Sequence, residues 1–289
     1  MTKHVHGGNI YTYKNCLDFS ANCNPLGTPE SVKQAVRDSL EYMKDYPQVG
    51  YAPLKKAIAE YEGVASESVI CGNGAAELVF SLCQAVKPKK ALIPVPTFAE
   101  YEQALTSCGC EVEHVLLREE EGFSLQDSFI NWLHRDLDMV FLCNPNNPTS
   151  SAIMQEDLRK LIAFCSGKNI FVMIDETYVE FAPDINAVTA VPLTREFTNL
   201  MVLRGVSKFY AAPGMRLGYG ITGNMEFLSK MREKQTPWSL NSLGAFAGEL
   251  MLRDHDYIQE TRDLILDERD RMEQELQNIP TFKVYPAYA

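Results

Sequence analysis

Short apolar runs alternate with amphipathic stretches between about residues 68 and 233. Apolar runs of this kind are typical of strands buried on both faces, and the amphipathic stretches between them are typical of helices. The pattern predicts strands at residues 91–94, 111–117, 139–143, 170–174, 200–203 and 217–221, and helices at residues 75–85, 99–107, 155–165 and 225–233. We therefore expect an α/β fold in which helices on both faces cover a mostly parallel, mixed sheet.

The two ends of the chain have a different pattern. One amphipathic helix is expected near residues 30–42, two more at residues 239–253 and 257–278, and a strand begins at residues 282–285. Because one isolated strand cannot satisfy its own backbone groups, we expect a smaller α+β lobe that is incomplete at its C-terminus. The predicted division is an N-terminal arm with part of the small lobe (1–45), a large domain (46–235) and the start of a C-terminal small domain (236–289).

The charge and the cysteine content restrict the kinds of binding partner and the cellular location that we expect. The net charge is -11 and no block of Lys and Arg offsets it, which disfavours nucleic acid and anionic membranes. No apolar run is long enough to span a membrane. The eight cysteines are scattered, and the pair Cys108 and Cys110 lacks the further ligands of a metal site. We expect reduced thiols, no metal and a cytoplasmic location. A nicotinamide enzyme is disfavoured because no Gly-x-Gly-x-x-Gly follows a strand.

Two charged residues follow predicted strands. Lys208 comes shortly after the strand at 200–203, and Asp175 comes directly after the strand at 170–174. A desolvated lysine amine can form a Schiff base, and a buried carboxylate needs a partner such as a protonated pyridine nitrogen. Taken alone, Lys208 is more often an exposed loop lysine, and a helix cap is the alternative for Asp175.

Five further residues could hold the remaining parts of pyridoxal phosphate. Arg216 and Ser207 offer a guanidinium and a hydroxyl to a phosphate. Tyr178 and Asn147 could hold the ring hydroxyl, and Phe98 could stack on the ring. Four of them have an ordinary alternative: a surface ion pair for Arg216, a turn for Ser207 and for Asn147, and core packing for Phe98. The joint order and spacing predict the cofactor.

In this order the residues resemble fold-type I pyridoxal phosphate enzymes of the class I/II aminotransferase superfamily. The resemblance implies that the domain at 46–235 binds the cofactor, with Lys208 as its Schiff-base lysine and Asp175 on the ring nitrogen. It also implies a homodimer in which Tyr51, in the run YPQVGY at 46–51, reaches the phosphate of the neighbouring subunit. The implied catalytic residues are Lys208, Asp175 and Tyr178, and the implied cofactor contacts also include Ala75, Ala76, Phe98, Asn147, Ser207, Arg216 and Tyr51.

Within the superfamily, several segments are similar to threonine-phosphate decarboxylases, which make aminopropanol phosphate for cobalamin assembly. They are HGGN at 6–9, DFSAN at 18–22, FAEY at 98–101, SKFY at 207–210 and PWS at 237–239. The resemblance implies a small phosphorylated amino acid as substrate, contacted by His6, Gly7, Asn22 and Asn147. A serine, Ser150, stands where this family usually has glycine, and the chain ends before the arginines with which the family holds its substrate.

Two alternatives remain from the sequence. One is an aminotransferase that acts on histidinol phosphate or a related amino donor. It would use the same cofactor and break a different bond at the substrate Cα, the bond that lies perpendicular to the ring. A noncatalytic binding or regulatory protein that kept the fold is the other alternative.

Overall fold

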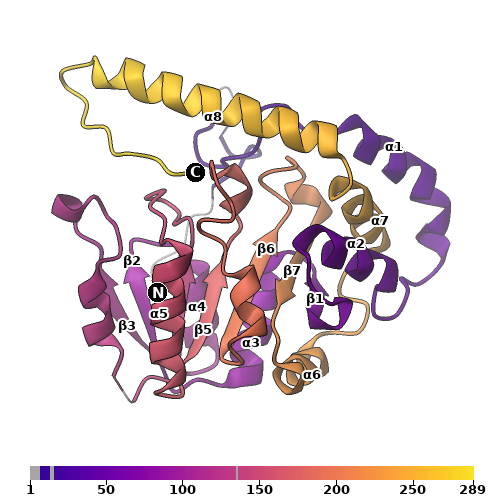
Figure 1. Cartoon of the computed structure of the whole chain (residues 1–289). Coiled ribbons are helices and arrows are strands. Elements are labelled where there is room, and N and C mark those ends of the chain that lie inside the picture. Colours follow the sequence, from indigo (N-terminus) through magenta and orange to yellow (C-terminus); the bar gives the residue numbers. More distant parts are fainter. Residues whose placement is uncertain (1–6, 14–15, 135) are drawn as a thin grey trace.

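The computed structural model describes residues 7–13, 16–134 and 136–289. Within these residues one sheet has seven strands in the order β1-β7-β6-β5-β4-β2-β3 (Figure 1). Strands β2 to β6 are parallel, whereas β7 is antiparallel to both β6 and β1. The bounds are β1 Val69–Gly72, β2 Lys90–Val95, β3 Glu111–Leu116, β4 Met139–Cys143, β5 Phe171–Asp175, β6 Leu200–Gly205 and β7 Gly218–Ile221.

The six strands predicted between residues 91 and 221 are all present, with ends that shift by at most two residues. Strand β1 was not predicted. It has only four residues, and its place in the sheet depends on antiparallel pairing with β7, which lies about 150 residues further along the chain. Such a pairing leaves no periodic signal in so short a segment.

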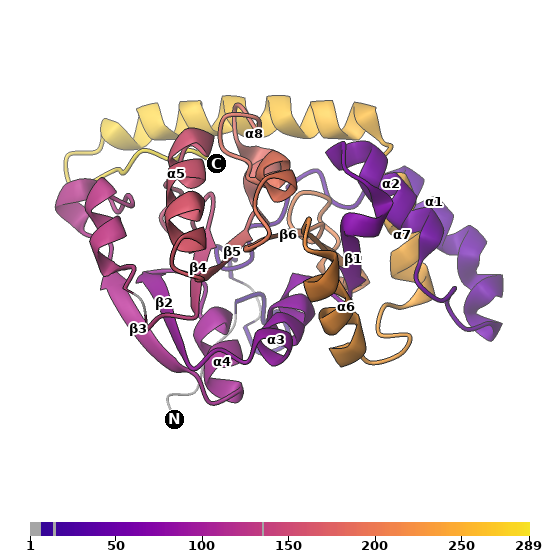
Figure 2. The same cartoon turned by 60° about the horizontal axis from the view of Figure 1, so that its bottom comes forward.

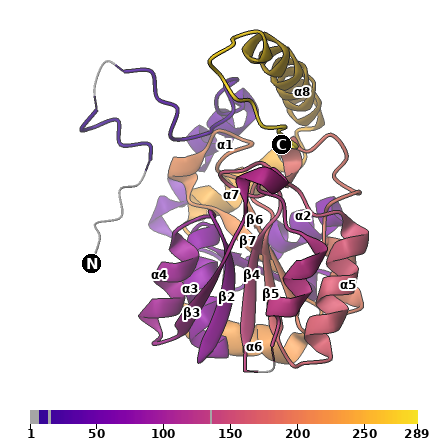
Figure 3. The same cartoon turned by 90° about the vertical axis from the view of Figure 1, so that its left-hand side faces the viewer.

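Helices cover both faces of the sheet, as expected. Figure 3 shows α3 (Ala75–Val86) and α4 (Glu100–Ser107) on one face and α5 (Gln155–Ser166) on the other. Helix α6 (Met225–Lys234) packs on the α3 face, and α2 (Ala52–Glu62), which was not predicted, packs on the α5 face. Side-chain alternation separates the two cores, because Met173 faces α3 whereas Val172 and Ile174 face α5.

The segments before and after the sheet come together. Helix α1 (Glu30–Ser39), followed by a 3₁₀ turn at Leu40–Lys44, packs against α7 (Ser242–Met251). The long helix α8 (His255–Gln277) crosses the molecule from this pair toward α5 (Figures 1 and 2). The contact between α1 and α7 supports the grouping of the two ends into one lobe, and the domain limits given above stay a prediction.

The predicted strand at residues 282–285 is wrong. This segment is irregular, because no strand of the described part of the chain pairs with its backbone. Its side chains are held instead by Glu119, which pairs with Lys283 and accepts a hydrogen bond of 2.5 Å from the Tyr285 hydroxyl.

Among the described residues, none of the helices is both long enough and apolar enough to cross a membrane.

Candidate active site

A cavity of about 570 Å³ lies at the C-terminal ends of the parallel strands. Open α/β sheets bind their ligands at this edge, because the loops that follow neighbouring strands meet there. All but two of the predicted site residues line the cavity: Gly7, Asn22, Ala75, Ala76, Phe98, Asn147, Asp175, Tyr178, Ser207, Lys208 and Arg216. The structure thus brings together side chains that are spread over 200 residues of sequence.

The N-terminus of α3 forms one wall of the cavity. No side chain caps this helix, so the first N–H groups, including that of Ala75, are free to bind an anion. Gly218 on β7 allows the close approach, since a Cβ at that position would lie 2.3 Å from the Ala75 nitrogen. The exposed Arg216 guanidinium lies against Gly74, where a Cβ would be 2.4 Å from Nη2. Together these groups make a positively polarised corner.

The carboxylate of Asp175 ends β5 and is buried. One oxygen accepts hydrogen bonds from the Thr177 backbone N–H at 2.9 Å and from its hydroxyl at 2.6 Å. The other accepts one from the Tyr101 hydroxyl at 2.8 Å. Burial raises the pKa of Asp175, and the bonds from Thr177 and Tyr101 act against that rise. A carboxylate oxygen accepts two such bonds, so, among the described residues, the oxygen facing Tyr101 retains one free acceptor site.

Lys208 is held against the N-terminal segment. Its Nζ donates to the Ala21 carbonyl at 2.6 Å, and its own carbonyl accepts from the Asn24 backbone N–H at 3.0 Å. The buried Asn24 amide donates to the Phe209 carbonyl at 2.8 Å and to Thr261 on α8 at 2.7 Å. These bonds place residues 21–24 beside Lys208 and bring Asn22 to the cavity.

Tyr178 and Asn147 come from two different loops and line both this cavity and an adjoining second one. A hydrogen bond from Asn22 reaches Tyr178, and burial raises the pKa of this phenol to about 12. The loop that carries Asn147 is fixed by Asn146, whose amide donates to the Pro96 carbonyl at 3.0 Å and whose oxygen accepts from Thr97 at 2.8 Å. The segment before Phe98 is therefore fixed to the Asn147 loop.

Two predicted residues lie elsewhere. Tyr51 is outside this cavity, where its hydroxyl donates to the Leu240 carbonyl at 3.0 Å and accepts from the Leu240 N–H at 3.2 Å. It lines a separate groove with Tyr42, Tyr46 and Phe246. His6 lies outside the described residues.

Sequence reasoning missed three residues that organise the site. Thr177 had a local signal, because a threonine two residues after an aspartate is typical of a turn in which the carboxylate accepts its N–H. Tyr101 belongs to the segment FAEY at 98–101, but no local pattern links Tyr101 to Asp175 or Asn24 to Phe209, because these partners lie far away in sequence.

The donor set fits pyridoxal phosphate. The free amides of α3 together with Arg216 and Ser207 suit its dianionic phosphate, and the one free acceptor site of Asp175 suits a single pyridinium N–H. Lys208 lines the same cavity. Among the described residues no cluster of His, Cys, Asp and Glu could hold a metal ion.

Comparison with known proteins agrees with this geometry. The profile of the family "Aminotransferase class I and II" matches residues 14–289. The chain belongs to this family. It is 39% identical to the threonine-phosphate decarboxylase of Salmonella typhimurium over 99% of this chain and 80% of that protein. It is 31% identical to histidinol-phosphate aminotransferase 2 of Archaeoglobus fulgidus over 96% of this chain and 77% of that protein.

Solved structures give the same assignment. The crystal structure of the histidinol-phosphate aminotransferase from Clostridium acetobutylicum superposes with a TM-score of 0.88 at 33% identity, over 95% of this chain and 81% of that one. A second neighbour, the Sinorhizobium meliloti histidinol-phosphate aminotransferase, has a TM-score of 0.78 at 22% identity over 89% of this chain and 70% of that one, and was solved in complex with pyridoxal-5'-phosphate. The predicted family, the type I fold with its mixed sheet, and the cofactor are confirmed, and the incomplete C-terminal lobe stays a prediction.

Proposed function

We propose that this aminotransferase-family protein is a lyase that decarboxylates L-threonine O-3-phosphate to (R)-1-aminopropan-2-yl phosphate in cobalamin biosynthesis. The observation that carries the proposal is the 39% identity to the Salmonella typhimurium decarboxylase across 99% of the chain. A related match is the bifunctional adenosylcobalamin biosynthesis protein CobDQ of Leptospira interrogans, at 29% identity over 98% of this chain and 34% of that protein.

Different residues of the cavity lining would bind different parts of the cofactor. Ala75, Ala76, Ser207 and Arg216 would hold the phosphate, and Phe98 would stack on the ring. Asn147 and Tyr178 would hold the ring hydroxyl, with Lys208 bonded covalently and Asp175 accepting from the ring nitrogen.

The proposed substrate would enter beside Asn147. A second cavity of about 250 Å³ shares Asn22, Asn147 and Tyr178 with the first and extends toward Ser150 and Ile265. We assign substrate contacts to Asn22 and Asn147, and to His6 and Gly7 of the N-terminal segment.

Two side chains would control protons. Bound pyridoxal phosphate supplies the electron sink for a broken bond at the substrate Cα. Asp175, already fixed by Thr177 and Tyr101, would keep the ring nitrogen protonated. After CO2 leaves, the Lys208 amine would deliver the proton that takes its place at Cα.

We further propose a cytoplasmic homodimer in which Tyr51 acts across the interface. The groove around Tyr51 is rich in aromatic side chains, and Tyr46, Val49 and Trp238 are exposed near it. Exposed apolar surface of this kind is typical of a protein interface. The free cysteines, most of them buried, suit a reducing compartment.

The alternative reaction is transamination of histidinol phosphate. It is favoured by the superposition on the Clostridium acetobutylicum aminotransferase, which has the higher TM-score, 0.88 against 0.79 for the L-threonine-O-3-phosphate decarboxylase of Porphyromonas gingivalis. The cofactor contacts are the same for both reactions, so the choice depends on the substrate.

One pair of assays separates the two reactions. The protein is loaded with cofactor and incubated with O-phosphothreonine, or with histidinol phosphate and 2-oxoglutarate. We expect CO2 and aminopropanol phosphate from the first mixture and no glutamate from the second. Glutamate from the second mixture without CO2 from the first would replace our proposal by the aminotransferase.

The Lys208→Ala variant tests whether the protein is an enzyme at all. Wild-type protein with pyridoxal phosphate should absorb at about 420 nm, as lysine-bound cofactor does, and the variant should lose both this band and CO2 release. A wild-type protein without the band would instead support a noncatalytic binding protein.

A further inference from the structure

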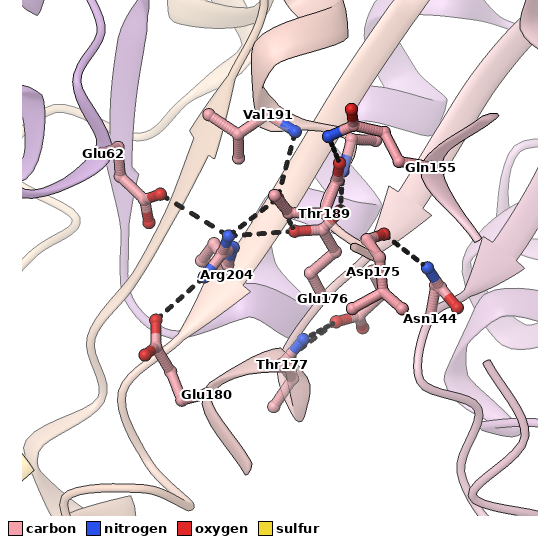
Figure 4. Close-up of polar contacts among 12 residues, drawn as sticks. Glu62, Asn144, Gln155, Asp175, Glu176, Thr177, Glu180, Thr189, Val191 and Arg204 are labelled. Atoms are coloured by element: carbon pink, nitrogen blue, oxygen red, sulfur yellow. Dashed lines mark hydrogen bonds and ion pairs between the residues drawn. The ribbon is translucent and has the colours of Figure 1, made fainter. Parts of the chain in front are cut away.

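A buried ionic cluster lies behind the cavity. Arg204 on β6 contacts Glu176 at 3.0 Å, Glu180 at 2.9 Å and Glu62 of α2 at 3.5 Å. The exposed fractions of these side chains are 4% for Arg204 and from 0 to 10% for the glutamates. Figure 4 shows Glu62 and Glu180 on one side of the guanidinium and Thr189 with Glu176 on the other. Four charged groups sequestered from water at one point need a specific reason.

The cluster brackets the segment that carries the proposed catalytic groups. Glu176 and Glu180 stand on either side of Thr177 and Tyr178, and both bind the same guanidinium. Glu176 is fixed further by the Thr189 hydroxyl at 2.8 Å and by the Ala190 N–H at 2.5 Å. Both ends of the loop after Asp175 are therefore fixed to the Arg204 guanidinium.

The same guanidinium belongs to the segment that leads to Lys208. Arg204 lies four residues before Lys208, and its side chain shares the face of Leu200 and Val202, opposite to Asp175. Arg204 does not line the cavity. Any effect on the cofactor must therefore act through the residues that Arg204 holds.

We propose that Arg204 is a positioning residue that fixes the Asp175–Tyr178 loop against the Lys208 segment and so sets the binding geometry of the cofactor. This inference rests on the proposed roles of Asp175, Tyr178 and Lys208.

The excess of carboxylates around Arg204 allows a second variant, Glu180→Gln, to test the inference. Three carboxylates face one guanidinium in the cluster, and the Tyr61 hydroxyl donates to Glu180 at 2.7 Å and the Tyr219 hydroxyl to Glu62 at 2.6 Å. Neutralising Glu180 leaves Arg204 paired with two carboxylates, so Glu180→Gln should fold. It nevertheless removes the ionic contact that holds the end of the loop.

The experiment compares Arg204→Lys and Glu180→Gln with two controls. Arg232→Lys and Glu196→Gln change an arginine and an arginine-bound glutamate outside the cavity. For each folded apoprotein we measure the dissociation constant of pyridoxal phosphate and the circular dichroism of the bound cofactor at about 420 nm. Thermal unfolding of each apoprotein is recorded separately.

We expect Arg204→Lys to raise the cofactor dissociation constant at least about 10-fold, because lysine cannot bind two carboxylates with a fixed fork. Glu180→Gln should raise it about 3-fold or more and lower the dichroism per bound cofactor, with an unfolding midpoint at or above that of wild type. Both controls should match wild type.

The outcomes are distinct. If Arg204→Lys does not fold, Glu180→Gln decides. Folded variants with wild-type affinity and dichroism would overturn the inference, even if their unfolding midpoints fell, because Arg204 would then serve stability alone. Wild-type protein that binds no cofactor would overturn both this inference and the proposed function. Wild-type protein that binds cofactor without releasing CO2 would overturn the proposed reaction only.

Discussion

Gly218→Ala tests whether the close packing of β7 on α3 builds the phosphate site. A Cβ at residue 218 would lie 2.3 Å from the Ala75 nitrogen, 2.7 Å from the Gly74 carbonyl carbon and 2.8 Å from the Ala75 Cα. All three are backbone atoms, so no side chain can rotate away. The Ala75 nitrogen must retreat to at least 3.0 Å, a movement of about 0.7 Å.

That movement displaces the first N–H groups of α3 by a large part of an ångström. Misplacement of about 1 Å in a binding site can cost about 100-fold, so we expect the dissociation constant of pyridoxal phosphate to rise about 10-fold to 100-fold. Crowding of this kind also destabilises a protein by about 1–3 kcal/mol. Cofactor titration of the apoprotein and urea unfolding measure the two effects.

Gly167→Ala is the matched control. Gly167 ends α5 with φ of -64°, and a Cβ there would meet its nearest neighbour, the Phe164 carbonyl oxygen, at 3.6 Å. Alanine fits this backbone, so stability should be unchanged or rise by about 0.4–1 kcal/mol, with cofactor affinity as in wild type. A Gly218→Ala protein with wild-type affinity and stability would refute the argument that this glycine positions the helix.

Three further predictions follow from the contacts. Burial raises the pKa of Glu176 to about 7 in the folded protein, so the contribution of Glu176 to stability is greatest below about pH 4.5 and is lost as the pH rises through about 7. The unfolding free energy of Glu176→Gln, measured relative to that of wild type, should therefore increase between about pH 5 and pH 8. A difference that stays constant with pH would contradict this. Thr177→Val removes the hydroxyl bond to the buried Asp175 and should lower the unfolding free energy of the apoprotein by about 1.5–3 kcal/mol in urea unfolding, whereas an unchanged value would mean that water replaces the bond. Mixed dimers of Lys208→Ala and Tyr51→Phe chains should be more active at limiting cofactor than either variant alone, because one site in each mixed dimer has both residues; no gain would mean that Tyr51 acts within its own chain.

The central strands could be predicted because burial on both faces leaves a continuous apolar run. The run at residues 170–174 gave β5 to within one residue and placed Asp175 at its end. Helix α2 was not predicted, although Pro53 in its first turn and Gly63 directly after its last residue are signals of a helix start and a helix end. The strand predicted at residues 282–285 is absent, because an apolar run forms a strand only where a partner strand exists.

The site was predictable in its chemistry but not in its supporting contacts. Lys208 and Asp175 were found because each follows a predicted strand, and Arg216 because it lies eight residues after Lys208; all three carry a charge that the cofactor needs. The Tyr101 hydroxyl that fixes Asp175 comes from a helix, 74 residues away in sequence. Arg204 contacts Glu62, which comes from another helix, α2. No local pattern in the sequence indicates contacts of this range.

Strand alternation gives two neighbouring carboxylates opposite environments. Asp175 pairs with Leu203 across β5 and β6 and faces the cavity, while the next residue, Glu176, donates its N–H to the Leu203 carbonyl at 2.8 Å and turns its side chain to Arg204 on the other face. A slip of one residue in this pairing would exchange the two carboxylates. The ion pair between Glu176 and Arg204 opposes such a slip, because the slip would move Glu176 to the other face and break its contact with the buried guanidinium. The buried cluster therefore also selects which of the two carboxylates faces the cavity.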